Sequence, residues 1–232
     1  MTVRLLVGVA AAAALVIGCT SAPEPRPSYL APQSECAAAA DPARLCIVIL
    51  GDSIGSGVPL QGDDRWWVKL QAGLAQDLPM RHVVVDDWAV SGSRVDLLET
   101  IAPGQPELDT YDVAIVIEGV NDQAGTPIEV WMPRYEAAVA AIEARGPLVI
   151  VATPPPGFED GAFTSRYEPT AEAIRQVASR GRPLMDIAAR WREDGAALAA
   201  TYYVDVIHQS AAGQTQMAEL ARGVVIEAVG AP

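Results

Sequence analysis

The sequence predicts an α/β domain in which helices cover both faces of one parallel sheet. From about residue 44 onward, short apolar runs alternate with longer amphipathic segments, which is the pattern of repeated βαβ units. The first run, 47–50, has four aliphatic residues without polar alternation, as expected of a strand covered on both faces. We therefore expect a three-layer α/β/α sandwich whose central parallel sheet has about five strands.

The composition fits one globular domain preceded by an additional amino-terminal segment. The chain has 232 residues, 50% of them hydrophobic and 19% charged, which is enough for a sizeable core. A net charge of −13 argues against nucleic acid as a partner, because like charges repel. The 3 cysteines lack the paired spacing of a zinc cluster, so we expect no metal and no cofactor. The sequence does not indicate the oligomeric state.

Residues 1–18 have the pattern of a lipoprotein signal peptide. The apolar run after Arg4 is shorter than the roughly 20 residues of a membrane-spanning helix. It ends in Val16-Ile17-Gly18-Cys19, which resembles a bacterial lipobox, where cleavage before the cysteine is coupled to lipid attachment on its sulfur. We expect a mature chain that begins at Cys19 and is held at the membrane of the cell envelope, outside the cytoplasm, by acyl chains. The alternative is an ordinary cleaved signal and a secreted protein.

Residues 19–43 are the expected tether between this anchor and a domain that spans 44–232. Prolines recur through the segment between Ser, Ala and Glu residues, a composition that favours an extended chain. Cys36 lies near the end of the tether and Cys46 lies in the first expected strand. Outside the cytoplasm a disulfide between them is a candidate, and the distance between their Cα atoms decides whether it forms.

Five apolar runs are candidate strands, and four longer segments are candidate helices. The strands are expected at 46–50, 82–85, 113–117, 148–152 and 184–187. The helices are expected at 66–76, 128–145, 170–180 and 211–229, because acidic or serine residues precede some of them and glycines follow others. The tryptophans are expected to pack helices against the sheet. The segment 154–168, after the fourth strand, is expected to be a long loop that walls a pocket.

Polar clusters stand where these strands end. Gly51-Asp52-Ser53 follows the first strand, Ser91-Gly92-Ser93 follows the second, and Gly119-Val120-Asn121-Asp122 follows the third. Because the carboxyl ends of parallel strands meet at one edge of a sheet, where ligands bind in open α/β folds, we expect the three clusters to lie together. Asp205 and His208 precede the last helix, and their spacing lets the carboxylate hold the far ring nitrogen of the imidazole.

Together these clusters resemble the sequence blocks of the SGNH hydrolases, also called GDSL esterases and lipases. The first cluster is similar to the family's Gly-Asp-Ser block, Gly92 to the glycine of its second block, and the third cluster to its Gly-x-Asn-Asp. Asp205-Val206-Ile207-His208 is similar to its closing Asp-x-x-His. The resemblance covers roughly 46–229 and implies a flavodoxin-like SGNH hydrolase fold.

The resemblance also implies a serine hydrolase that cleaves acyl or acetyl esters of a small molecule or a glycan. It implies Ser53 as nucleophile, His208 as general base and Asp205 as the group that orients it. The implied oxyanion donors are the backbone N–H groups of Ser53 and Gly92 and the side-chain amide of Asn121. Two further carboxylates are expected to hold the loops, namely Asp52 and Asp122.

Family members often have Asn, Gly and Pro at three positions where this chain has Asp87, Val206 and Gln209. No reacting group is lost by these differences, which bear on loop geometry and on the choice of substrate. Two other functions stay open at this point. One is an O-acyltransferase that passes the acyl group to a glycan, and the other is a non-catalytic envelope lipoprotein that binds a glycan or an acyl ligand.

Other families fit the order of the motifs less well. Residues 51–55 also match the Gly-x-Ser-x-Gly elbow of α/β-hydrolases, but an elbow serine normally follows several strands and Ser53 follows the first. A trypsin-like chain has its histidine and aspartate before the serine, whereas Asp205 and His208 come after it. The loop lacks the third glycine of a dinucleotide site and the lysine of a Walker site.

Overall fold

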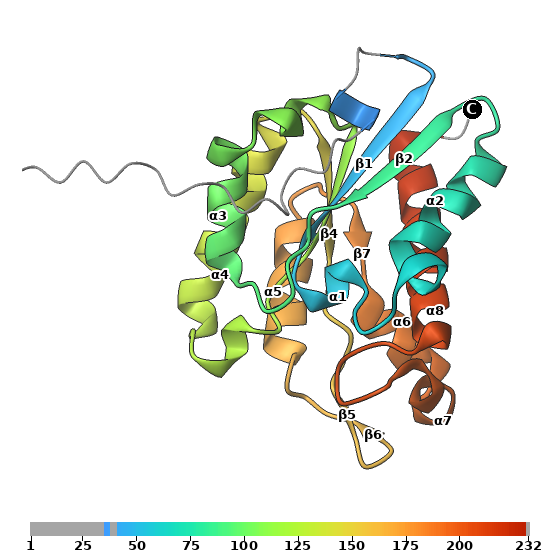
Figure 1. Ribbon diagram of the computed structural model, residues 1–232. Coiled ribbons are helices and arrows are strands. Elements are labelled where there is room, and N and C mark those ends of the chain that lie inside the picture. The colour runs from blue at the N-terminus through green and yellow to red at the C-terminus, as the bar shows by residue number, and fades with distance from the viewer. Residues whose placement is uncertain (1–34, 38–40, 231–232) are drawn as a thin grey trace, which may run out of the picture.

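The computed structural model describes residues 35–37 and 41–230. The signal peptide, Cys19 and most of the expected tether lie outside the described residues. The main sheet has five parallel strands in the order β2-β1-β3-β4-β7, with helices on both sides (Figure 1), which confirms the predicted fold class. Its strands are β1 (Arg44–Gly51), β2 (His82–Asp87), β3 (Val113–Ile117), β4 (Leu148–Ala152) and β7 (Leu184–Met185).

The helices fall into two layers, one on each face of the sheet. Those on one face are α2 (Trp66–Asp77), α6 (Ile187–Asp194) and α8 (Ala211–Val229). Those on the other face are α3 (Val95–Gly104), α4 (Ile128–Glu143) and α5 (Glu168–Ala178). Figure 1 shows the second group on the left of the sheet and α2 and α8 on its right. Two short helices lie outside these layers, α1 (Ser53–Ser56) and α7 (Ala196–Ala199).

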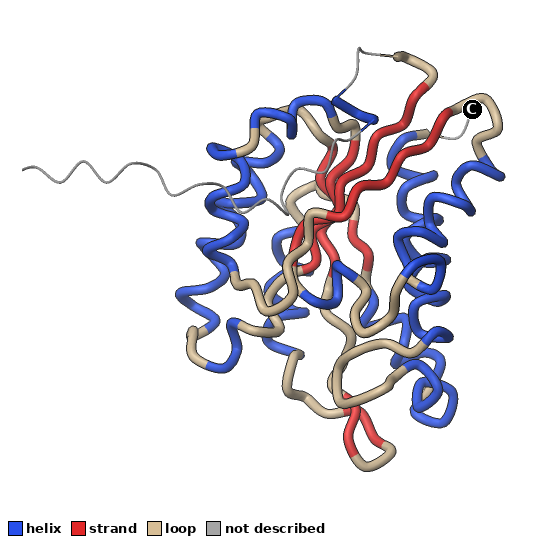
Figure 2. The backbone as a smooth tube through the Cα atoms, in the orientation of Figure 1, coloured by secondary structure: helices blue, strands red, loops and turns tan. Residues whose placement is uncertain are grey.

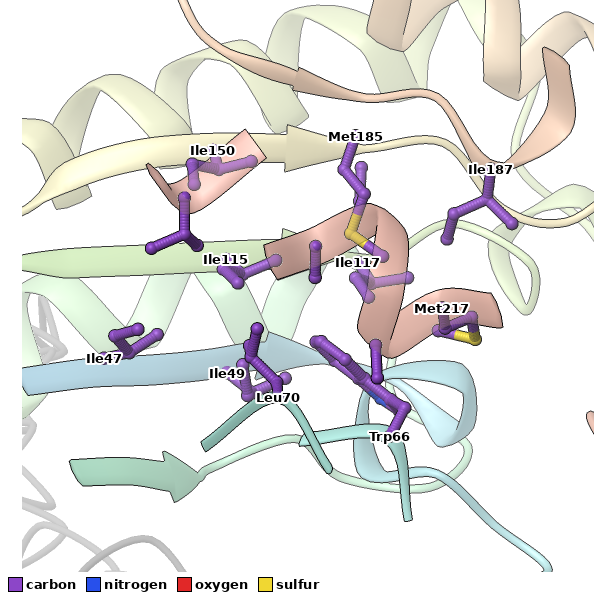
Figure 3. Close-up of a cluster of buried hydrophobic side chains, with 14 of the residues drawn as sticks. Ile47, Ile49, Trp66, Leu70, Ile115, Ile117, Ile150, Met185, Ile187 and Met217 are labelled. Carbon is purple, nitrogen blue, oxygen red and sulfur yellow. The ribbon is translucent and has the colours of Figure 1, made fainter. Parts of the chain in front are cut away.

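The alternation of side chains along β1 explains why there are two cores. Successive side chains of a strand point to opposite faces, so Leu45, Ile47 and Ile49 pack against α2, α6 and α8. Figure 3 shows Ile49 of β1 beside Leu70 of α2, with Ile47 farther along the same strand. The intervening residues of β1 pack against α3, α4 and α5. Every residue from 45 to 50 is buried, as the run without polar alternation predicts.

The tryptophans act mainly as packing residues. Trp66, Trp88, Trp131 and Trp191 are at most 2% exposed, consistent with the predicted role. The indole N–H of Trp66 also donates to Gly55 O at 2.8 Å. The first turn of α2 therefore holds α1 in place at the end of the sheet.

Several element boundaries differ from the prediction. The last strand stops at Met185, because the side chain of Asp186 accepts a hydrogen bond from Ala189 N at 3.0 Å and thereby begins α6. The fifth helix begins at Glu168, two residues early, with Pro169 in its first turn. The sequence prediction missed α3, α6, α1 and α7.

The segment after β4 is not a plain loop. It contains a small antiparallel hairpin of β5 (Phe158–Glu159) and β6 (Ala162–Phe163), the short red pair that Figure 2 shows below the main sheet. Phe158 N donates to Val206 O at 2.9 Å, and the rings of Phe158 and Tyr203 stack with centroids 5.1 Å apart. The hairpin is thus attached to the loop that carries His208.

A disulfide joins Cys36 to Cys46 of β1, with Cα atoms 5.9 Å apart. It lies near the amino end of β1, whereas α1 and the β5–β6 hairpin lie at the carboxyl end (Figure 1). Among the described residues, no helix combines the length and apolar character needed to cross a membrane.

Candidate active site

The turn after β1 places Ser53 at the carboxyl edge of the sheet. Gly51 has φ +134°, and a Cβ at this position would lie 1.7 Å from Ile117 O, so only glycine fits beside β3. Asp52 N donates to the same Ile117 oxygen at 3.1 Å, which extends the pairing of β1 with β3 by one residue. The Asp52 side chain then accepts from Ile54 N at 2.9 Å and caps α1. Ser53 is consequently the first residue of a helical turn.

Ser53, His208 and Asp205 form one continuous chain of hydrogen bonds. Ser53 Oγ lies 3.0 Å from His208 Nε2, and His208 Nδ1 lies 2.8 Å from Asp205 Oδ2. The serine is 5% exposed, and the side chains of His208 and Asp205 are 29% and 50% exposed. The structure thus brings together the three residues for which the sequence predicts catalytic roles, although Ser53 and Asp205 are 152 positions apart in the sequence.

The loop that carries this pair is closed at its base. Val204 N donates to His208 O at 3.0 Å, and Tyr203 pairs with Gln209. Inside the loop, Asp205 Oδ1 accepts from Ile207 N at 2.9 Å and from His208 N at 2.7 Å. Partial burial raises the pKa of Asp205, but these two hydrogen bonds and the contact with the imidazole outweigh it, so the pKa is below its ordinary value. Asp205 therefore stays ionised beside His208.

The loops after β2 and β3 are tied to the nucleophile loop. Val90 N donates to Gly51 O at 2.8 Å, and Asn121 Nδ2 donates to Ser93 O at 2.9 Å. Gly92 stands between them with φ +84°, a backbone conformation that favours glycine, and a Cβ there would meet no protein atom within 4 Å. The requirement for glycine is thus conformational. Gly92 and Asn121 both lie in the loops that flank Ser53.

The two predicted loop-supporting carboxylates do bridge segments of the site. Asp122 accepts from Val95 N at 3.2 and 3.3 Å and so joins the loop after β3 to the first residue of α3. Burial raises the pKa of Asp122, and this hydrogen bond acts against the increase. Asp52 is fully buried, and its burial raises the pKa to about 6, although the hydrogen bond from Ile54 N and the neighbouring Glu118 and Val120 act in the opposite direction.

Sequence reasoning missed Glu118, which lies at the centre of these loops. It is 1% exposed, and its carboxyl group accepts from Gly119 N at 2.9 Å and contacts Ser93 Oγ at 2.8 Å. Burial first, and then the neighbouring charge of Asp52, raise its pKa well above the ordinary value. The only signal in the sequence is an acidic residue directly after the apolar run 113–117.

A shallow hollow of ≈ 330 Å³ adjoins Gly92. Its lining includes the polar side chains of Ser91, Ser93, Arg94 and Asp96. A larger hollow of ≈ 440 Å³ lies beside the disulfide at the other end of β1, and none of the predicted catalytic side chains lines it. Volume alone does not mark the site.

The sequence profile of the GDSL-like lipase/acylhydrolase family matches residues 49–216, well over half of the chain. The chain belongs to this family. It is accordingly a carboxylic ester hydrolase. The match begins two residues before Gly51 and extends into α8, so it includes every predicted catalytic and oxyanion residue.

Solved structures share the fold of this GDSL-like hydrolase. The acetyl xylan esterase AlAXEase is 19% identical with a TM-score of 0.65, covering 78% of this chain and 100% of its own. A lipase/acylhydrolase from Enterococcus faecalis is 18% identical with a TM-score of 0.66, covering 80% and 97%. A lipolytic G-D-S-L family protein from Veillonella parvula is 18% identical with a TM-score of 0.62, covering 77% and 96%. A comparison with curated proteins gives no match.

The described part of this GDSL-like hydrolase contains no group of three or more His, Cys, Asp or Glu side chains placed to hold a metal ion. The acidic residues of the site are instead bound to backbone N–H groups, to Ser93 or to His208.

Proposed function

We propose that this hydrolase cleaves acyl or acetyl esters through a triad of Ser53, His208 and Asp205. The observation that carries the proposal is the unbroken chain from Ser53 Oγ through the imidazole to Asp205, with distances of 3.0 and 2.8 Å. With the proton of the imidazole on Nδ1, facing the ionised Asp205, the lone pair on Nε2 faces the serine hydroxyl. This arrangement suits a histidine that acts as general base.

In the proposed reaction Ser53 Oγ attacks the ester carbonyl carbon while His208 Nε2 takes the hydroxyl proton. The bond to the alcohol then breaks, and His208 returns the proton to the leaving alcohol. A water molecule attacks the acyl-serine, again losing its proton to His208, and the acid leaves with Ser53 restored. Asp205 stays ionised throughout and stabilises the imidazolium.

The negative oxygen of the tetrahedral intermediate needs donors that are in place before the reaction. We assign this role to the backbone N–H groups of Ser53 and Gly92 and to Asn121 Nδ2. Two features support the assignment: Ser53 opens a helical turn, where N–H groups are free of helical partners, and Asn121 is held on its loop by the 2.9 Å bond to Ser93 O. Each such donor is typically worth about 10²–10³ in turnover.

For the substrate we propose an acetyl or other short acyl ester of a polar alcohol, including a sugar. The polar hollow beside Gly92 supports this choice, since hydroxyl and charged side chains suit a hydroxyl-rich alcohol portion. One structure with the same fold is described as an acetyl xylan esterase. Transfer of the acyl group to a sugar is the alternative outcome.

The test labels the purified protein with a fluorophosphonate and maps the adduct by mass spectrometry. We expect the adduct on Ser53, and we expect Ser53→Ala to lose both labelling and ester hydrolysis. Ser56→Ala is a matched control in the same helical turn and should keep both. Labelling absent from Ser53 in well-folded protein would overturn the triad.

Rates on nitrophenyl esters of increasing acyl length, and on acetylated xylo-oligosaccharides, then define the substrate. Our proposal expects the rate to fall as the acyl chain lengthens. A rate that rises with acyl-chain length would contradict this proposal and indicate a lipase instead. Recovery of the acetyl group on an added sugar, with little free acetate, would replace hydrolysis with transfer.

We further propose that the protein works outside the cytoplasm, anchored through lipid on Cys19 after removal of residues 1–18, with 19–43 as tether. The sequence Val16-Ile17-Gly18-Cys19 and the disulfide between Cys36 and Cys46 support an oxidising compartment and a lipidated cysteine. In a bacterial host fed an alkyne fatty acid, the protein should take up the label in the membrane fraction, and Cys19→Ser should not. Equal labelling of both proteins would contradict the anchor.

A further inference from the structure

A pair of buried carboxyl groups lies behind the proposed nucleophile and has no part in the acyl-transfer steps. Gly51 of β1 is in register with Ile117 of β3, so the next residues of the two strands, Asp52 and Glu118, are neighbours across the sheet edge. Asp52 is 0% exposed and Glu118 is 1% exposed. Two ionised carboxylates buried in this way would repel each other without solvent to screen them.

The surroundings of Asp52 point to a proton on its neighbour. Asp52 Oδ2 is buried and has no hydrogen-bond partner among the described residues. Glu118 acts on Asp52 as a neighbouring side chain and can donate to this oxygen only as a neutral acid, because an ionised carboxylate has no proton to donate. Ser93 Oγ lies 2.8 Å from Glu118 Oε2 and can donate to it, since the nearby Gly51 O already accepts from Val90 N at 2.8 Å. The single proton of a neutral Glu118 is then free to face Asp52 Oδ2.

The proton belongs mainly to Glu118. Burial and the charge of Asp52 both act to keep Glu118 neutral. Each carboxyl group accepts a backbone hydrogen bond, Asp52 from Ile54 N and Glu118 from Gly119 N, so these two bonds do not distinguish them. Glu118 is the weaker acid to begin with, because its ordinary pKa is 4.5 and that of Asp52 is 3.8.

The other titratable groups that face the pair are Asp122, whose charge disfavours a Glu118 anion, Tyr135 of α4, and Tyr167, which precedes α5 and interacts with Asp52. Beyond Asp52 lies His208, which favours the Asp52 anion when the imidazole is positively charged.

Glu118 is also the hub that joins the three loops of the site. Through Asp52 it reaches the cap of α1 and therefore Ser53. Through Ser93 it reaches the loop of Gly92, and Ser93 O in turn holds Asn121 Nδ2 at 2.9 Å. Its own Oε1 accepts from Gly119 N at 2.9 Å, which fixes the start of the loop after β3.

We propose that Glu118 is a positioning residue that works as a neutral acid, donating its proton to Asp52 and accepting from Ser93 Oγ, so that the oxyanion donors stay aligned behind Ser53. It does not touch the substrate. The proposal rests on the proposed function only in its kinetic part, since the buried proton exists whether or not the protein turns over an ester.

The first test asks directly for the proton. The infrared difference spectrum of wild type minus Glu118→Gln at pH 7 should show the C=O stretch of a protonated carboxyl group. Glu129→Gln, a change at an exposed glutamate of α4, is the matched control and should show no such band. Absence of the band in the Glu118 difference spectrum would overturn the proposal, and this measurement needs no catalysis.

Stability against pH gives a second readout that is independent of turnover. Because the pKa of Glu118 is raised in the folded protein, the folded state keeps a proton that the unfolded state releases above about pH 4.5. The free energy of unfolding of the wild type should therefore fall, relative to Glu118→Gln, as pH rises from about 4.5 through the folded pKa. If urea unfolding gives the same difference in free energy between wild type and Glu118→Gln at pH 5 and at pH 8, the proposal is overturned.

The kinetic test compares two replacements. In Glu118→Gln the new side-chain amide can donate to Asp52 and to Ser93 Oγ while its oxygen accepts from Gly119 N. This variant should therefore keep kcat within a few-fold. We expect kcat of the wild type to fall at alkaline pH, where Glu118 ionises, and kcat of Glu118→Gln to lack this fall. Glu118→Leu supplies no donor and should lower kcat by about 10²–10³, the value of one misplaced oxyanion donor, with a smaller change in KM.

Equal losses in kcat for the two replacements, or full activity in Glu118→Leu, would overturn the positioning role. If Glu118→Leu does not fold, the infrared band and the pH dependence of kcat in Glu118→Gln still test the proposal. The Ser53→Ala variant tests the triad and the protonated Glu118 separately. We expect it to be inactive, as the triad requires, and to keep the infrared band, because the proton on Glu118 does not depend on Ser53. Activity in Ser53→Ala protein would contradict the proposed triad but would not affect the proposal that Glu118 is protonated.

Discussion

The carboxylates on the two sides of Ser53 differ in exposure and in charge. Asp205, on the His208 side, is 50% exposed at its side chain and accepts three hydrogen bonds, from two backbone N–H groups and from the imidazole. Asp52 and Glu118, on the opposite side, are at most 1% exposed and share a contact with each other. The pKa of Asp205 is lowered, whereas the pKa values of Asp52 and Glu118 are raised.

The difference shows that the number of donors, weighed against burial, decides the charge of each carboxyl group. The ionised Asp205 lets His208 become positive in the proposed reaction. The neutral acid on the buried side lets loops that carry polar groups pack without adding negative charge near the oxyanion. The exposed side is therefore suited to stabilising a charge on His208, and the buried side to positioning loops without adding charge. Substitutions on each side can test these two tasks separately.

The largest expected effect comes from breaking the exposed side with Asp205→Asn. In this variant the amide oxygen can still accept from Ile207 N and His208 N, so the loop should keep its shape. The amide nitrogen would face His208 Nδ1 with a donor, which favours the wrong imidazole tautomer. We expect kcat on nitrophenyl acetate to fall by about 10³–10⁴ with little change in urea unfolding. A loss below tenfold would contradict a role for Asp205 in orienting the histidine.

A smaller effect is expected at the far end of the buried side, from Asn121→Ala. This change removes the side-chain amide proposed as an oxyanion donor, together with its 2.9 Å bond to Ser93 O. We expect kcat to fall by about 10²–10³, or roughly 3–4 kcal/mol, with a modest change in KM. An unchanged rate of ester hydrolysis would remove Asn121 from the site.

Much of the fold and of the His208 side could be predicted because each depends on local patterns. The strands of the main sheet are apolar runs, and Asp205 and His208 are three residues apart. The missed helix α3 has no such signal: Arg94 provides no side-chain cap, and Pro103 lies within the helix. Its position is fixed instead by packing on the sheet and by the bond from Val95 N to Asp122.

The buried side could not be predicted for a similar reason. The pairing of Asp52 with Glu118 depends on the register of β1 with β3, in which Gly51 lies opposite Ile117. Register is a property of the assembled sheet, and the sequence shows only an acidic residue after an apolar run. The charge of Glu118 follows from this three-dimensional arrangement.

The smallest expected effect is on stability, from a change at Asp87. Asp87 lies at the end of β2, away from Glu118 in the sheet order, so it tests whether burial alone raises a carboxyl pKa at a position outside the Asp52–Glu118 pair. Its side chain is 14% exposed, and burial raises its pKa to about 6, against a bond from Ala89 N and the nearby Arg65. A raised pKa means that stability falls as pH rises from about 4 to about 6.

Replacing Asp87 by Asn keeps an acceptor for Ala89 N and removes the buried charge, at the loss of the 3.8 Å contact with Arg65. The difference between the ordinary pKa of 3.8 and about 6 corresponds to at most roughly 3 kcal/mol, and the lost Arg65 contact offsets up to about 1 kcal/mol. We therefore expect Asp87→Asn to gain about 1–2 kcal/mol over wild type between pH 4 and pH 7.5 in urea unfolding. A difference in the free energy of unfolding that stays constant across this range would show that burial with a single N–H donor does not raise the pKa of Asp87. The raised pKa values of Asp52 and Glu118 would then have to be explained by their contact with each other alone.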